Sequence, residues 1–153
     1  MNKIKILFLV GIISTIFCAE NPEYVEDKSA DIKTLVDKQN NNGEVVSLTN
    51  TALKEYLKKS DDALLIIKFY APWCGPCNRM EKGFQELSEE FSDVLFTSVN
   101  IDTEDAITEQ YDISSVPTII FIKNGEEIKR IIGYKSKPTL RKIVKKVLNR
   151  ATQ

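Results

Sequence analysis

From Val45 onward, short apolar runs alternate with segments in which apolar residues recur every three or four positions. The runs predict β-strands, and the spaced residues predict amphipathic helices. Strands are expected at residues 45–48, 64–70, 95–101, 118–122 and 128–132. Helices are expected after residue 50, after residue 77, at 105–111 and at 137–149. The order βαβαβαββα predicts an α/β fold with a mixed central sheet flanked by helices on both faces.

Three of these elements carry specific signals. Residues 64–70 are nearly all apolar, as expected for a strand that is covered on both faces. The helix that follows has a single apolar stripe, formed by Met80, Phe84, Leu87 and Phe91. The dipeptide Asn124-Gly125 predicts a tight turn, which makes the last two strands a hairpin.

The N-terminal part of the sequence predicts export. Lys3 and Lys5 precede an apolar run of small and aliphatic residues that reaches Ala19, as in a secretory signal peptide. The run is shorter than the roughly 20 apolar residues that a membrane span needs. We therefore expect a signal segment at 1–19, with Cys18 either removed or lipidated, a polar arm at 20–44, and a folded domain at 45–150. The expected location is the secretory pathway or another space outside the cytoplasm.

The composition limits the chemistry. The chain has three cysteines and no histidine, which excludes a Cys-His pair, a Ser-His-Asp triad and imidazole metal sites. With Cys18 in the signal segment, Cys74 and Cys77 remain, and two ligands are too few for a tetrahedral zinc site unless a metal is shared across a dimer. The net charge of −1 argues against nucleic-acid binding. We expect a reactive cysteine pair and neither a metal nor another cofactor.

The position of this pair suggests redox chemistry. Cys74-Gly75-Pro76-Cys77 directly follows a buried strand and begins a helix. At a helix N-terminus, free N–H groups and the positive end of the helix dipole stabilise a thiolate, which favours Cys74 as the attacking sulfur. Cys77 lies one turn further on, where it would be shielded and would resolve the product. Pro76 is tolerated in the first helical turn, and Gly75 lets a substrate backbone approach.

Several motifs resemble those of the thioredoxin family. The segment from Ala71 to Cys77, with Trp73 before the first cysteine, resembles the family's active-site signature, and Val116-Pro117-Thr118 resembles its cis-proline loop. The resemblance extends over residues 45–150. It implies a thioredoxin fold, a cis Pro117 facing the disulfide, and a substrate groove lined by Trp73, Val116 and Gly133, beside Gly75 and Pro76.

The chain departs from the family pattern at Lys68. Family members usually carry a buried acid six positions before the first active-site cysteine, and here a solitary lysine stands in an apolar strand. Ser98 likewise stands where a lysine is often found, and Gly83 near a common proline. Lys68 either extends its ammonium to a sheet edge or lies beneath the disulfide, where it would tune the pKa of the thiols.

The function implied by the resemblance is thiol–disulfide exchange, with Cys74 and Cys77 reducing disulfides in exported protein substrates. Such a reductase needs an electron donor, either a reductase or a membrane donor, which the sequence does not identify. A net oxidase or isomerase is an enzymatic alternative. A different class is a structural, client-gripping subunit of a secretory or export assembly.

Overall fold

One mixed five-stranded sheet forms the centre of the computed structural model, which describes residues 43–151. Its strands are β1 (Val46–Ser47), β2 (Leu64–Tyr70), β3 (Val94–Asn100), β4 (Thr118–Lys123) and β5 (Glu126–Ile132), in the order β1-β3-β2-β4-β5. β3 runs parallel to β1 and β2, whereas β4 is antiparallel to β2 and β5. The predicted signal segment and residues 20–42 of the predicted arm lie outside the described residues.

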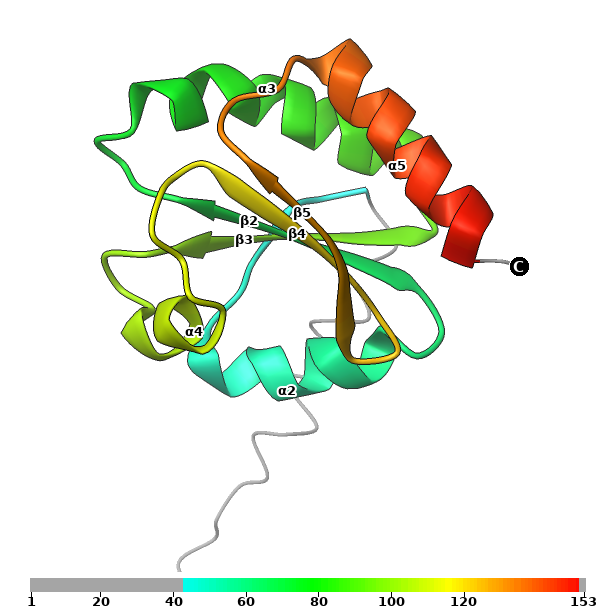
Figure 1. Ribbon diagram of the computed structural model, residues 1–153, viewed down its shortest axis with the longest axis horizontal. Helices are drawn as coiled ribbons and strands as arrows, with labels where there is room; N and C mark the ends of the chain where they lie inside the picture. The colour runs from blue at the N-terminus through cyan, green and yellow to red at the C-terminus, as the bar shows by residue number, and fades with distance from the viewer. Residues whose placement is uncertain (1–42, 152–153) are drawn as a thin grey trace, which may run out of the picture.

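Helices cover both faces of this sheet, which confirms the predicted fold class. They are α2 (Asn50–Lys59), α3 (Gly75–Glu90), α4 (Asp105–Gln110) and α5 (Lys137–Ala151). Figure 1 shows α3 and α5 on one face and α2 and α4 on the other. Within residues 43–151, no helix is long and apolar enough to cross a membrane.

The central strand β2 supplies side chains to both cores because successive residues of a strand point to opposite faces. Leu64 and Ile66 pack in the core beneath α3 and α5. Leu65, Ile67 and Phe69 pack in the core on the side of α2 and α4. Lys68 follows Leu64 and Ile66 by the same alternation, so it enters the α3 face of the sheet.

The hairpin turn forms as predicted. Asn124 and Gly125 both adopt positive φ, at 54° and 73°, which is the backbone that a two-residue turn of this kind requires. Ser60, at the end of α2, holds the turn in place. Its carbonyl accepts from Asn124 N at 2.9 Å, and its hydroxyl accepts from Gly125 N at 2.8 Å.

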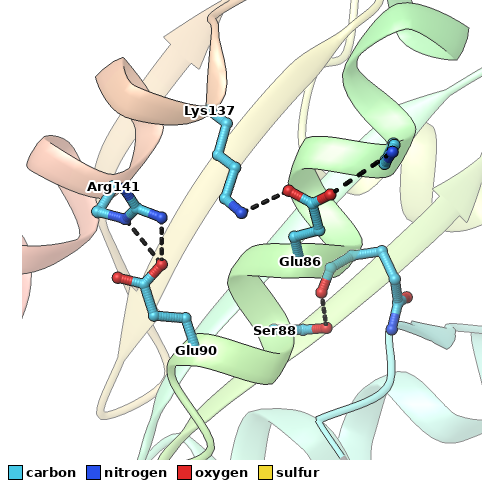
Figure 2. Close-up of polar contacts among 7 residues, drawn as sticks. Glu86, Ser88, Glu90, Lys137 and Arg141 are labelled. Carbon is cyan, nitrogen blue, oxygen red and sulfur yellow. Dashed lines mark hydrogen bonds and ion pairs between the residues drawn. The ribbon is translucent and has the colours of Figure 1, made fainter.

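Helices α3 and α5 meet through a close backbone approach and two ion pairs. A Cβ added to Gly83 would lie 3.1 Å from Cβ of Lys137, so the glycine allows the start of α5 to lie near α3. Lys137 pairs with Glu86, and Arg141 pairs with Glu90 (Figure 2). The nearest nitrogen and oxygen of Arg141 and Glu90 lie 2.6 Å apart. All four of these charged side chains are partly exposed.

Candidate active site

The cysteine pair lies where β2 gives way to α3. Cys74 and Cys77 form a disulfide, with their Cα atoms 5.2 Å apart. Cys74 is the N-cap of α3, and its Sγ accepts a hydrogen bond from the backbone N–H of Cys77 at 3.1 Å. Pro76 occupies the first turn, where its missing N–H removes no helical hydrogen bond. This end of the helix therefore directs the N–H of Cys77 and the positive end of the helix dipole toward the sulfur of Cys74.

Both sulfurs belong to a small buried cluster. In the disulfide form Cys74 is 4% exposed and Cys77 is 1% exposed, and both pack with Ala71. Tyr70 and Val116 are among the partly buried side chains that pack against this cluster. Cys77 has the shielding expected for it, and Cys74 is also largely covered, although it is the slightly more exposed residue of the two.

Trp73 provides an exposed apolar surface beside the disulfide. Its side chain is 70% exposed, and its indole Nε1 donates to Oδ2 of Asp102 at 3.0 Å. Asp102 lies just after β3, so this hydrogen bond ties the indole ring to the segment that follows β3. An aromatic ring held at its polar edge leaves its apolar face free for a partner.

The cis-proline loop lies beside the same cluster. The Val116–Pro117 peptide bond is cis, which confirms that prediction. The carbonyl of Pro117 accepts from Gly133 N at 2.8 Å, so the end of β5 is tied to the loop. Gly133 adopts a φ of +80°, a conformation that suits glycine. Gly75 and Pro76, at the start of α3, are both exposed. The structure thus packs Val116 against the cysteine cluster and ties Gly133 to Pro117, while Trp73, Gly75 and Pro76 adjoin the cysteines in sequence.

Lys68 is buried in the core and is paired with a carboxylate. Its side chain is 0% exposed, and its Nζ lies 2.5 Å from Oε2 of Glu81, on α3. The ammonium also lies 4.7 Å from the centre of the Phe84 ring and 5.4 Å from that of Tyr70. Lys68 is the one charged residue of β2, and its counterion, Glu81, comes from α3.

The electrostatics of Lys68 follow from this environment. Burial lowers the pKa of its amine, and the hydrogen bond and negative charge of Glu81 partly oppose that effect. The alternative in which the ammonium reaches solvent at a sheet edge is wrong, since β2 lies between β3 and β4 and the side chain has no exposure. Lys68 instead lies on the face of the sheet that α3 covers.

Two residues of the site, Asp102 and Glu81, were not identified from the sequence. For Glu81 the available signal was its spacing, since it follows Cys77 by four positions and so shares its helix face. For Asp102 the signal was the need of a tryptophan N–H for a partner. Within residues 43–151, no cluster of three or more histidine, cysteine or acidic side chains is arranged to hold a metal ion.

Known proteins with similar sequences are thioredoxins. The family model described as Thioredoxin matches residues 44–146. A thioredoxin of Chlamydia caviae is 43% identical over 81 residues, which cover 53% of this chain and 79% of that protein. The chloroplastic M-type thioredoxin of Spinacia oleracea is 36% identical over 107 residues, covering 69% of this chain and 59% of that protein.

Solved structures give the same match. A Schistosoma mansoni thioredoxin pre-protein superposes with a TM-score of 0.62 at 35% identity, covering 67% of this chain and 97% of that one. Trypanosoma brucei brucei thioredoxin superposes with a TM-score of 0.64 at 26% identity, covering 71% and 94% of the two chains.

Proposed function

The chain belongs to the thioredoxin family and is a disulfide reductase with a redox-active cysteine pair, and we propose that it reduces disulfides of exported proteins outside the cytoplasm. The family membership supplies the chemistry. The N-terminal sequence supplies the proposed compartment, and it is the observation on which the choice of substrate depends.

The reaction begins with the reduced pair. Cys74 lies at the N-terminus of α3, where the N–H of Cys77 donates to its sulfur, so its thiolate is stabilised relative to a free cysteine. This thiolate attacks one sulfur of a substrate disulfide. A mixed disulfide forms between Cys74 and the substrate, and the other substrate sulfur leaves as a thiolate.

Cys77 completes the reaction. Its thiol loses a proton and attacks Sγ of Cys74, which breaks the bond to the substrate and re-forms the Cys74–Cys77 disulfide. Two electrons have then passed from the cysteine pair to the substrate. Because Cys77 is 1% exposed, this step takes place away from solvent.

The support for export comes from residues 1–19. Lys3 and Lys5 are followed by a continuous apolar and small-residue run that ends before Glu20, which is the arrangement of a secretory signal peptide. Such a segment would direct the chain into a space where protein disulfides form and persist. The substrates available there are exported proteins that contain disulfides.

This location sets a requirement for reducing power. Thioredoxins reduce protein disulfides and are themselves reduced by thioredoxin reductases. In an oxidising compartment the cysteine pair needs a donor that carries electrons across the membrane. We therefore include a membrane-bound thiol donor among the partners of this protein.

The export proposal is tested by locating the protein in its own cells. Fractionation and mass spectrometry of the N-terminus should find it outside the cytoplasm, beginning at Ala19 or Glu20, or at a lipid-modified Cys18. A Leu9→Asp variant, which places a charge in the apolar run, should stay in the cytoplasm with Met1 or Asn2 at its start. Recovery of the unaltered protein from the cytosol with its first 19 residues intact would contradict export.

The substrates are identified by trapping. A Cys77→Ser variant should accumulate mixed disulfides on Cys74 with exported proteins, since nothing resolves them. A Cys74→Ser variant is the matched control and should trap few. If a strain that carries both substitutions keeps the wild-type phenotype, the cysteines are not needed and a client-gripping role through the exposed Trp73 is favoured.

A further inference from the structure

Lys68 places a positive charge within an apolar face of the sheet. The strands on either side present Ser98 and Ile119 opposite it, and neither side chain carries a charge. Glu81 is the carboxylate in contact with the ammonium, at 2.5 Å. Removing the partner of a buried cation is strongly destabilising, because the charge is then left without compensation in the protein interior. Chemistry that neutralises Glu81 therefore has the lowest cost when it leaves another negative charge nearby.

Glu81 is placed between that buried cation and solvent. Its side chain is 54% exposed, while one of its oxygens contacts Lys68, which has no exposure. It follows Cys77 by one helical turn, and residues four apart lie on the same face of a helix. Long helical side chains lean toward the helix N-terminus, and this tendency directs the Glu81 side chain toward the turn that holds Cys77.

Tyr70 connects the charged pair to the cysteines. Its ring lies 5.4 Å from Nζ of Lys68, and the same residue packs against the cluster of Ala71, Cys74 and Cys77. Lys68 and Glu81 therefore lie on β2 and α3, the two elements whose junction carries the cysteines, and Tyr70 contacts both groups. Among the described residues, Tyr70 is the further titratable side chain beside Lys68, and Cys77 lies one helical turn before Glu81. From α5, Lys137 lies near Gly83 and pairs with Glu86 instead.

We propose that Glu81 accepts the thiol proton of Cys77 in the resolving step and that Lys68 positions it for this transfer. The proposal depends on the disulfide reductase activity of the cysteine pair and is independent of where the protein is located.

The charges balance throughout the step. The proton moves from Cys77 to the carboxylate of Glu81, and the negative charge moves in the opposite direction, so Lys68 keeps an anion beside it. The Cys77 thiolate attacks Sγ of Cys74, the Cys74–Cys77 bond forms, and the substrate leaves as a thiolate. As the substrate thiolate departs, Glu81 releases the proton through its exposed side, to that thiolate or to water, and its carboxylate again neutralises Lys68.

The experiment separates the two halves of the reaction. The reduced full chain, with Cys18→Ser so that only the active pair carries thiols, is mixed with one equivalent of an aromatic disulfide whose thiolate is coloured. Attack by Cys74 releases the first thiolate, and resolution by Cys77 releases the second. Both rates are followed by stopped-flow absorbance across a range of pH.

A Glu81→Gln variant keeps the size and hydrogen-bonding capacity of the side chain but accepts no proton. Its second phase should be slowed about tenfold or more at pH 7, with the first phase unchanged, and should recover at high pH, where hydroxide deprotonates Cys77. Glu86→Gln, on the same helix and also paired with a lysine, is the matched control and should leave both phases unchanged.

Lys68→Met provides a second test. It removes the buried charge itself, so no buried charge is left without a partner. Its second phase should also be slower at pH 7, with the midpoint of the pH profile moved upward, since the Cys77 thiolate loses its neighbouring cation. A wild-type second phase in folded Glu81→Gln, equal slowing in Glu86→Gln, or a wild-type profile in Lys68→Met would overturn the proposal. The first phase reports whether Cys74 still reacts, so loss of all activity is distinguished from loss of this step.

Discussion

Helix α3 carries two glutamates that pair with lysines in very different surroundings. Glu81 reaches inward to Lys68 of β2, whose side chain is 0% exposed, whereas Glu86 reaches across to Lys137 of α5, which is 29% exposed (Figure 2). In the inner pair burial lowers the pKa of the lysine. In the outer pair the hydrogen bond from Lys137 lowers the pKa of the glutamate.

The contrast shows how burial changes the contribution of a lysine–glutamate ion pair to stability. An exposed pair is screened by water and salt and contributes little to stability. A buried charge carries a desolvation penalty that its partner only partly offsets, so an apolar residue of similar size is often as stable or more so. Packing alone therefore gives no reason for a lysine at position 68, whereas the proposed role of the Lys68–Glu81 pair in the resolving step gives one.

The largest difference between the two pairs is expected when the glutamate is removed. Glu81→Ala leaves Lys68 buried without a counterion and should lower the free energy of unfolding by about 3 kcal/mol at pH 7, as breaking a buried pair does. Glu86→Ala leaves Lys137 in contact with water and should change stability within experimental error. Urea denaturation of the oxidised proteins measures the free energy of unfolding of both variants. Equal losses would show that burial does not increase the contribution of the inner pair to stability.

Removing the buried lysine should change how stability depends on pH. The pKa of Lys68 lies below its usual 10.5 in the folded protein, so between the two values the unfolded chain binds more protons and stability rises with pH. Lys68→Met should abolish this rise and be about 1 kcal/mol more stable than the wild type at pH 7, with the difference shrinking toward pH 10.5.

The control for that experiment is Lys137→Met, which removes a partly exposed charge and should keep the alkaline slope of the wild type. Denaturant midpoints between pH 7 and pH 10 give the comparison. A Lys68→Met protein that is less stable than the wild type at neutral pH and keeps the slope would mean that burial of the charge carries no penalty here.

The fold was largely predictable because local patterns determine it. The stripe of Met80, Phe84 and Leu87 has the period of a helix, and all three side chains are buried in α3. The Asn124-Gly125 dipeptide requires the positive φ values that the hairpin turn displays. The short strand β1 was the least predictable element. Its two residues pair only with β3, so tertiary contacts rather than its own sequence set its length.

Of the contacts between side chains of the site, only the disulfide could be predicted from the sequence. Cys74 and Cys77 are three residues apart, so the sequence alone brings them together. The contacts of Lys68 with Glu81 and of Trp73 with Asp102 join residues 13 and 29 positions apart, from different elements. Which side chains meet across such distances depends on how α3 is rotated on the sheet and where the loop after β3 ends, and neither is encoded by spacing.

A smaller effect is expected at Gly83, which brings the outer pair together. An alanine there gains up to about 1 kcal/mol of helix propensity over glycine. Its Cβ would lie 3.1 Å from Cβ of Lys137, so α5 must shift by a few tenths of an ångström. The two effects oppose each other, and Gly83→Ala should change the free energy of unfolding by less than about 0.5 kcal/mol. Gly83→Leu, which cannot be accommodated by a small shift, should lose about 1–3 kcal/mol.

The smallest effect is expected from breaking the outer pair itself with Lys137→Met. The pKa of Glu86 is lowered below 4.5 in the folded protein, so its contribution to stability is complete above that pH and is lost as the pH falls through the folded value. The difference between wild type and Lys137→Met should therefore be small at pH 7, absent at pH 2, and absent in 1 M salt at either pH, because salt screens exposed charges. Melting temperatures under these conditions test this, with Glu86→Gln as the matched variant. If the difference persists in high salt, the outer pair is held by packing of the Lys137 stem against α3 rather than by charge, and its contrast with Lys68 and Glu81 is one of geometry rather than of burial.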